Sequence, residues 1–364
     1  MNFKTEISTT ADEKTWDKNL LQSKESSAYQ SYNWSKIYQE GYDSKPIFIS
    51  VEDNSGKIVG QLLAFIHNKY YWANATFVVR TIGYKANLGS VLMWWYGPII
   101  HDFSNRSEII SQILLAVDKV VKKNNIMMIR GSSPPLANSH DDVFKKNGYG
   151  LKPWATYVID LQQDPDNLYN LLNKKTRYDI RKSEKNALEF EVATDRSSLD
   201  EYEQLKYLAK KIEGERPGPK NRRFYDAQWK YLQKNGYQKL FLVKHEGKPI
   251  SGILTVTFNG NIIQHGVVNY SERDLLGGTF LTWNVIKWGI KMKYLTFDLG
   301  GVNPYHKSAK EKQIDFYKSK WEGKLTHYST YTKILDKIRF NASIGIIYPG
   351  RALTKVIDAL TKNG

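Results

Sequence analysis

Residues 294–324 bring together the side chains and backbone features that could carry out a reaction. Apolar residues alternate with polar ones from 295 to 299, which predicts a buried strand. That strand ends at Gly300-Gly301, where the backbone can turn sharply or lie close to a ligand. A basic loop then leads to Tyr317-Lys318. A strand end, a glycine pair and a nearby cation predict a site for an anion or for acyl transfer.

The residues that covalent catalysis needs are missing from the sequence. It has no cysteine, no Gly-x-Ser-x-Gly elbow, no Walker A loop and no His-Glu-x-x-His helix. Its 7 histidines are scattered without the spacing of metal ligands, so we expect no metal site. Transfer of an activated acyl group to an amine fits this inventory, with Lys318 stabilising the oxyanion. The alternative is an ordinary surface lysine beside aromatic residues.

Excess positive charge indicates polyanionic partners. Lys and Arg number 53 against 37 Asp and Glu, a net charge of +16, which favours nucleic acid, phosphorylated precursors or an anionic membrane. One basic segment is a candidate for contacts with tRNA phosphates, because residues spaced by four share one helix face. A solvated charged helix face is the alternative reading. The segment contains Lys174, Lys175, Arg177, Arg181 and Lys185.

Two parts of the chain follow the same pattern, which predicts a duplicated α/β unit. Residues 48–63 and 241–255 each read as a strand, a Gly-Lys turn and a second strand with an early glycine. A helix at 107–124 with a strand at 126–130 likewise resembles a helix at 279–292 with a strand at 294–299. Chance similarity of two hairpins is the alternative. A further strand is expected at 91–100.

The placement of the protein in the cell can also be predicted. Residues 1–20 are acidic and lack the apolar stretch of a signal peptide. The longest apolar run, 91–100, is far shorter than the roughly 20 residues that span a bilayer. We therefore expect a cytoplasmic protein that contacts the inner membrane face at most peripherally. The tail 331–364 could lie on a membrane or dock as a helix.

The ordered set of motifs resembles the FemABX transferases, which transfer amino acids from aminoacyl-tRNA to the peptide of a cell-wall precursor. The resemblance implies two tandem acetyltransferase (GNAT)-like domains of mixed α/β fold. We place them at 1–160, on the acceptor side, and 161–330, on the donor side, followed by a helical tail at 331–364. The matching motifs begin at Gln30, Tyr96, Lys174, Gln264, Phe297 and Tyr317 and end at Lys36, Asp102, Asn186, Gly266, Pro304 and Gly323.

The resemblance also implies roles for individual residues. Lys318 would stabilise the tetrahedral intermediate, with Tyr317 beside the aminoacyl ester, and Asp102 would accept a proton or orient the substrate. The residues that it implies for substrate binding are Lys36, Trp34, Arg216, Tyr225 and His265.

Three functions remain open at this point. The first is an aminoacyl-tRNA-dependent transferase of peptidoglycan and cell-wall biogenesis, and hence of cell shape, that acts as a monomer without a cofactor. Its partners would be aminoacyl-tRNA and a nucleotide- or lipid-linked precursor. The second is an acyl-CoA-type N-acyltransferase for an amino sugar or surface polysaccharide. It is less favoured because Leu276 stands where the pyrophosphate-binding turn of such enzymes has its first glycine. The third is a non-catalytic RNA- or membrane-binding protein on the same scaffold.

Overall fold

A computed structural model describes residues 3–68, 88–137, 141–212, 222–233, 235–270 and 273–343. The chain folds into two compact units. Unit 1 comprises 1–25, 29–152 and 329–364, and unit 2 comprises 26–28 and 153–328. Each unit is therefore built mostly from one half of the chain.

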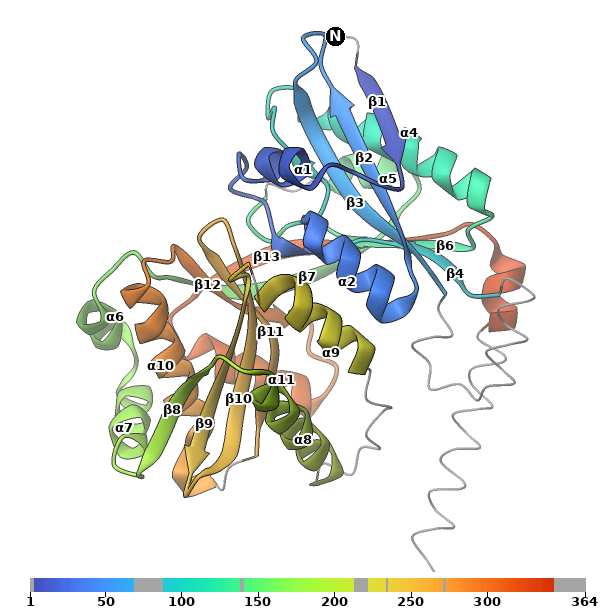
Figure 1. Ribbon diagram of the computed structural model, residues 1–364. Coiled ribbons are helices and arrows are strands. Elements are labelled where there is room, and N and C mark those ends of the chain that lie inside the picture. Colours follow the sequence, from blue (N-terminus) through green and yellow to red (C-terminus); the bar gives the residue numbers. More distant parts are fainter. Residues whose placement is uncertain are drawn as a thin grey trace, which may run out of the picture. The chain divides into compact units, whose positions relative to one another are not determined.

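Unit 1 is a mixed sheet flanked by helices (Figure 1). Its strand order is β1-β2-β3-β4-β6-β13, with β5 paired to β3. Its elements are β1 (Lys4–Ser8), α1 (Glu13–Leu20), α2 (Tyr32–Tyr42), β2 (Lys45–Glu52), β3 (Ile58–Asn68), β4 (Ser90–Met93), β5 (Ile99–Ile100), α4 (Arg106–Asn124), β6 (Met128–Ser132) and α5 (Asp141–Lys146). A short 3-10 helix, η1 (Ala28–Gln30), lies between α1 and α2.

Unit 2 repeats this arrangement, with strand order β7-β12-β11-β10-β9-β8. Its helices are α6 (Pro165–Leu171), α7 (Lys174–Ser183), α8 (Arg196–Ile212), α9 (Arg222–Gln228), η3 (Trp229–Gln233), η4 (Arg273–Leu275), α10 (Gly277–Lys291) and α11 (Ala309–Ser319). Its strands are β7 (Gly150–Asp160), β8 (Leu188–Ala193), β9 (Gln238–His245), β10 (Lys248–Phe258), β11 (Asn261–Asn269) and β12 (Thr296–Val302). The last strand, β13 (Lys324–Ile334), begins in unit 2 and makes its pairing with β6 in unit 1.

The predicted duplication and mixed α/β fold are confirmed. In each unit an antiparallel series of strands, β1-β2-β3 or β8-β9-β10, is followed by one more strand, a helix (α4 or α10) and a strand that pairs in parallel with the one before the helix. The parallel pairs are β4 with β6 and β11 with β12. The boundary between the units falls within β7 and β13. As a result, β13 pairs with β6 in unit 1 at 330–334, and β7 pairs with β12 in unit 2 at 155–160.

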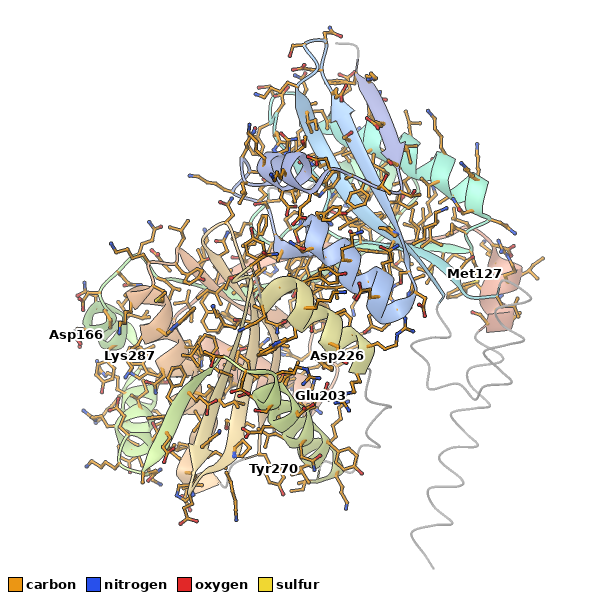
Figure 2. The ribbon with its side chains drawn as sticks, in the orientation of Figure 1. Met127, Asp166, Glu203, Asp226, Tyr270 and Lys287 are labelled. Carbon is orange, nitrogen blue, oxygen red and sulfur yellow. The ribbon has the colours of Figure 1, made fainter. Side chains whose placement is uncertain are left out.

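Helices cover both faces of the sheet in unit 2. One face carries a core shared with α6, α7 and α10, to which β12 contributes Phe297 and Leu299. The opposite face packs on α8 and α9 through Tyr202 and Leu205. In Figure 2, the labelled residue Lys287 belongs to α10 on the first face. Glu203 of α8 and Asp226 of α9 are labelled on the opposite face. Side chains that alternate along β12 therefore face different layers.

The apolar stripe of α4 forms the centre of unit 1, as its sequence period predicts. Eight of its residues, from Ile109 to Val121, are buried against β2 and β3. The helix ends at Asn125, which adopts the left-handed conformation. Arg339 donates hydrogen bonds to the backbone and side-chain oxygens of Asn125 at 3.0 and 2.9 Å. The start of the tail is thus fastened to unit 1; residues 344–364 lie outside the described residues.

Three local predictions differ from the structure. The strand expected to end at Gly300-Gly301 continues through both glycines to Val302, because β12 keeps its pairing with β7 beyond the register shift. The strand expected at 91–100 is wrong as a single element, because the backbone turns between β4 and β5, where Tyr96 has a positive φ of 48°. The basic segment is helical only to Ser183, after which Glu184 caps α7. Lys185 therefore follows the helix instead of extending the stripe of Arg177 and Arg181.

Candidate functional site

Two parallel strands of unit 2 separate at the end of their pairing. β11 and β12 pair only from Asn261 to Ile263, opposite Thr296 to Asp298. Beyond this point β11 stays with β10 as far as Asn269, while β12 stays with β7 as far as Val302. We call the resulting gap the strand opening.

An irregularity in each strand marks the strand opening. On β11, Leu254 pairs with Gly266 and Thr255 with Gln264, so His265 is an extra residue in the ladder. On β12, the register with β7 shifts between Asp298 and Gly301. Such bulges redirect side chains and end strand pairing, and they are frequent next to active sites.

Lys318 extends from the end of α11 into the strand opening. Its ammonium Nζ donates hydrogen bonds to the carbonyl oxygens of Gly300 at 2.8 Å and Gly301 at 3.1 Å. Gly300 has φ +78°, and a methyl group there would lie 3.2 Å from the Gln264 carbonyl oxygen and 3.6 Å from Lys318 Nζ. The backbone conformation therefore favours glycine, and the Gln264 carbonyl oxygen leaves little room for a side chain, whereas the distance to Lys318 is an ordinary contact. The pairing of Lys318 with Gly300-Gly301 agrees with the sequence analysis.

Burial changes the acidity of Lys318. Only 8% of the residue is exposed, and desolvation lowers the pKa of its amine to about 8, opposed by the charges of Asp298 and Asp315. Asp315 is held by the Tyr157 hydroxyl at 3.0 Å and lies 3.1 Å from His306 Nε2. Lys318 is thus mostly protonated at pH 7 and loses its proton as the pH rises through about 8.

A buried carboxyl on β12 lies next to this lysine. Asp298 Oδ1 accepts a hydrogen bond from the Gly300 N–H at 2.7 Å and another from the Thr156 hydroxyl on β7. The same hydroxyl lies 2.9 Å from the Gly300 carbonyl oxygen. Burial raises the pKa of Asp298, against these hydrogen bonds and the charge of Lys318. Sequence reasoning names Asp298 only as part of a motif and misses Thr156.

Tyr317 points to a different element from Lys318. Its hydroxyl donates to the Gly278 carbonyl oxygen at 2.7 Å and contacts Thr282 Oγ1 at 2.8 Å, both on α10. Burial raises the pKa of Tyr317 to about 12. The hydroxyl is thus a neutral group that fastens α11 to the start of α10. The helix begins after Leu276, which adopts the left-handed conformation with φ 55° where a glycine would be usual.

Lys320 is a second lysine of altered acidity that sequence reasoning misses. Its Nζ donates to Thr279 Oγ1 at 3.1 Å in the first turn of α10 and lies 4.5 Å above the Tyr317 ring. Desolvation lowers its pKa to about 8, opposed by the charge of Asp179. The spacing of three between Tyr317 and Lys320 on a helix could have indicated this stacking.

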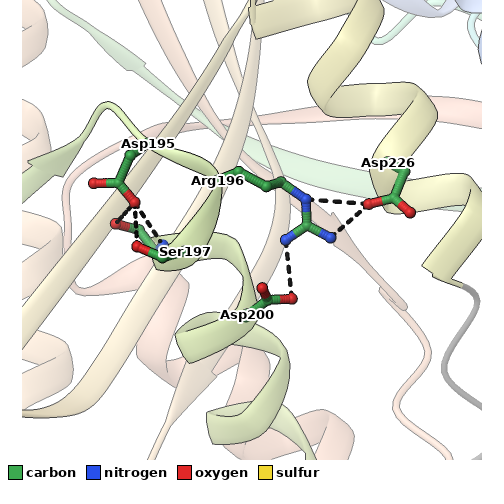
Figure 3. A network of polar contacts seen from close by, with 6 residues as sticks. Asp195, Arg196, Ser197, Asp200 and Asp226 are labelled. Atoms are coloured by element: carbon green, nitrogen blue, oxygen red, sulfur yellow. Dashed lines mark hydrogen bonds and ion pairs between the residues drawn. The ribbon is translucent and has the colours of Figure 1, made fainter.

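The α8 and α9 layer positions Tyr225. Arg196 at the start of α8 donates to Asp200 at 3.0 Å and, through Nε, to Asp226 of α9 at 3.1 Å (Figure 3). Lys206 of α8 donates to the Tyr225 hydroxyl at 2.8 Å. Two contacts therefore fix α9 against α8.

His265 lies near the same layer, with its ring 6.3 Å from that of Phe224. Burial, with a smaller effect from the Lys206 charge, lowers the pKa of His265 to about 4, so the imidazole is neutral at pH 7. It is a hydrogen-bonding group there and not a cation.

The predicted substrate residues of unit 1 have mixed environments. Trp34 is 1% exposed and packs edge-on against Tyr29, within the aromatic core. Lys36 lies 5.1 Å above the Tyr32 ring. Asp102 accepts hydrogen bonds from Asn105 Nδ2 at 2.7 Å and Ser104 N at 2.9 Å. These bonds, the one from the Asn105 side chain first, lower the pKa of Asp102, which weakens it as a base.

The basic residues of α7 are mainly exposed. Lys174 and Arg181 are open to solvent, Lys175 pairs with Asp179 at 2.8 Å, and Arg177 donates to the Asn170 carbonyl at 3.1 Å. The predicted role in phosphate binding stays a prediction. Arg216 lies outside the described residues.

An aromatic ring lies beyond the end of the parallel strand pair in unit 1. β4 and β6 pair from Val91 to Met93, where β4 ends. The Trp94 indole donates to the Gly97 carbonyl at 3.0 Å, and a methyl group on Gly131 would lie 2.0 Å from the ring. After β4 the backbone stays close to β6, with Trp94 N–H donating to the Arg130 carbonyl oxygen at 3.1 Å and Gly97 N–H to that of Ser132 at 2.9 Å, and the indole packs over Gly131.

A cavity of about 670 Å³ lies elsewhere in unit 2, between α8 and the β9–β10 turn. Leu205, Ile250 and Tyr270 are among its lining residues, and Lys318 is not. Among the described residues, no group of acidic or histidine side chains could hold a metal ion. Within the same residues, the helices lack the length and apolarity that crossing a membrane needs.

Comparison with known proteins identifies the fold. The acetyltransferase (GNAT) domain model matches residues 174–308, and no curated protein matches the sequence. The structure of FemX is similar with TM-score 0.72 and 14% identity, over 94% of this chain and 99% of that one. A tandem GNAT protein from the clavulanic acid biosynthesis pathway has TM-score 0.55 and 11% identity over 91% and 98%. The C-terminal domain of a putative lysylphosphatidylglycerol synthetase from Agrobacterium fabrum has TM-score 0.53 and 11% identity over 92% and 93%.

These matches confirm the tandem GNAT-like fold and, at the level of the fold, the resemblance to the Fem transferases. The chain carries a GNAT domain of the acyltransferase type in its second half. The matched residues contain β11 and β12, which border the strand opening, and α10, which connects them.

Proposed function

We propose that the protein is an aminoacyltransferase that moves an amino acid from aminoacyl-tRNA to an amine of a cell-wall precursor peptide. The observation that carries the proposal is the Lys318 ammonium in the strand opening, held by two carbonyl oxygens. The similarity to FemX supports this class of reaction, and the charge of +16 suits two polyanionic substrates.

Counting hydrogen bonds defines what Lys318 can do. A protonated amine has three N–H donors, of which the carbonyls of Gly300 and Gly301 occupy two. The third makes no hydrogen bond with any residue that the structure describes, so it can bind the carbonyl oxygen of the acyl donor and stabilise the oxyanion that forms on it. A neutral amine has only two N–H groups, and both would be occupied. The account therefore requires the protonated form.

The reaction needs no covalent enzyme intermediate. The acceptor amine attacks the ester carbonyl carbon and forms the C–N bond, with negative charge on the oxygen beside Lys318. Collapse of this intermediate breaks the C–O bond to the ribose. The leaving hydroxyl takes a proton and the attacking nitrogen loses one, which leaves an amide and free tRNA. No cofactor is required, and the protein would act as a monomer in the cytoplasm or at the inner membrane face.

The GNAT domain match favours an acyl-CoA donor as the second candidate, with an amino sugar or polysaccharide precursor as acceptor. The third candidate function is non-catalytic binding of RNA or of a membrane. The discriminating experiment offers the protein radiolabelled aminoacyl-tRNA or an acyl-CoA thioester, each with muropeptide and amino-sugar acceptors. The proposal expects transfer that ribonuclease abolishes. Transfer from the thioester without RNA would replace it by the second function, and RNA or vesicle binding without transfer would replace it by the third.

A further inference from the structure

We infer that Asp298 and Thr156 are positioning residues that hold the backbone turn at the Gly300–Gly301 irregularity of β12 and keep Lys318 charged. This inference rests on the proposed function for its catalytic meaning, although its physical content concerns Lys318 alone. Both side chains are buried, with 6% and 0% exposed. Neither belongs to the residues that sequence reasoning assigns to the site.

The first part of the argument is geometric. Asp298 and Thr156 contact the turn at two atoms of Gly300: its N–H donates to Asp298 Oδ1 at 2.7 Å, and its carbonyl oxygen lies 2.9 Å from Thr156 Oγ1. That carbonyl oxygen also accepts from Lys318 Nζ at 2.8 Å. Any shift of the turn therefore moves the ammonium in the strand opening.

The second part follows from the single proton of the Thr156 hydroxyl, which has two neighbouring acceptors. When Asp298 is ionised, Thr156 donates to the carboxylate, and the Gly300 carbonyl is left to Lys318. When Asp298 is protonated, it donates to Thr156, whose own proton turns to the Gly300 carbonyl and competes with Lys318. The ionised carboxylate thus favours the Lys318 ammonium through hydrogen bonds as well as through charge.

Within the described part of the chain, the charges that act on Lys318 are those of Asp298 and Asp315. Asp315 on α11 also favours the protonated lysine, and its own partners are Tyr157 on β7 and His306 before α11. Lys320 on the same helix points to Thr279 of α10. Asp298 is thus the acidic group on the strand that Lys318 contacts, and its charge favours the ammonium at least as strongly as that of Asp315 does.

The test is a direct titration of Lys318 by NMR on protein with ¹³C-labelled lysine, assigned with Lys318→Arg. Asp298→Asn keeps an acceptor for the Gly300 N–H and removes the charge. We expect the pKa of Lys318 to fall by at least about one pH unit. An unchanged titration in Asp298→Asn would overturn the inference. Because this readout needs no substrate, it stands or falls independently of the proposed function.

Thr156 provides the matched pair. Thr156→Val removes the hydroxyl at nearly constant shape, and we expect the pKa of Lys318 to fall, whereas Thr156→Ser should restore the wild-type titration. If the pKa of Lys318 is the same in Thr156→Val as in Thr156→Ser, the Thr156 hydroxyl has no part in keeping Lys318 charged.

Turnover supplies a second readout. With a pKa lowered from about 8 to about 7, the protonated fraction of Lys318 at pH 8 drops about fivefold and at pH 6 hardly at all. The kcat of Asp298→Asn relative to that of the wild type should therefore be about fivefold lower at pH 8 than at pH 6, with little change in KM. A loss that is equal at both pH values would indicate a purely structural role and contradict the inference.

Discussion

Replacing Lys318 by methionine should remove a pH-dependent part of the protein's stability. Burial lowers the pKa of Lys318 from 10.5 to about 8 in the folded protein. Between these values the unfolded chain binds more protons than the folded one, so the free energy of unfolding rises with pH. The difference of about 2.5 pH units, at about 1.36 kcal/mol per unit, amounts to about 3 kcal/mol. Below pH 8 the cost of burying the charge is present in full.

Denaturant unfolding of the wild type and Lys318→Met at pH 7 and pH 10 measures this effect. We expect the wild type to gain about 2–3 kcal/mol relative to the variant between the two pH values. Other groups titrate in both proteins and cancel in the difference. Lys324→Met, at an exposed position at the start of β13, is the control and should show no such gain. A stability difference between wild type and Lys318→Met that is the same at both pH values would refute the burial of a charged Lys318.

Three other changes probe the site and the fold. Gly300→Ala should destabilise the protein by about 1–2 kcal/mol and reduce turnover; Gly247→Ala, also at positive φ but with open space around it, should cost stability without affecting turnover in an activity assay. Arg106→Ala leaves the Glu25 carboxylate buried without its arginine and should cost about 3–5 kcal/mol by denaturant unfolding, with a loss under 1 kcal/mol counting against a buried pair. Lys174→Glu with Arg181→Glu should weaken tRNA binding and lower its salt slope, and an unchanged slope in a filter-binding assay would exclude α7 from phosphate contacts.

The sequence predicts that Lys318 lies near the glycine pair, although β12 continues through both glycines to Val302. The alternation at 295–299, the glycine pair and Lys318 lie within about one strand and one helix of each other, so their contact follows from short-range geometry. The repeated hairpin and helix–strand pattern likewise predicts both units. Turn chemistry is where prediction fails first, because Tyr96 and Leu276 adopt positive φ without being glycine and therefore carry no recognisable signal.

Long-range partners cannot be predicted from these patterns. Thr156 is 142 residues from Asp298, and the two meet because β7, which precedes the second repeat, pairs with β12 in unit 2. Such an exchange of strands between chain halves leaves no periodic signal in the sequence. Lys320 is missed for a related reason, since its environment depends on the start of α10 and on α7.

The central claim is that the Lys318 ammonium stabilises the oxyanion of acyl transfer. The most direct measurement is the single-turnover rate of Lys318→Met with aminoacyl-tRNA and acceptor at pH 7, alongside the Kd of the donor. We expect the rate to fall by about 10²–10³-fold, as for loss of an oxyanion-binding donor, with the Kd nearly unchanged. A rate equal to that of the wild type would contradict the claim.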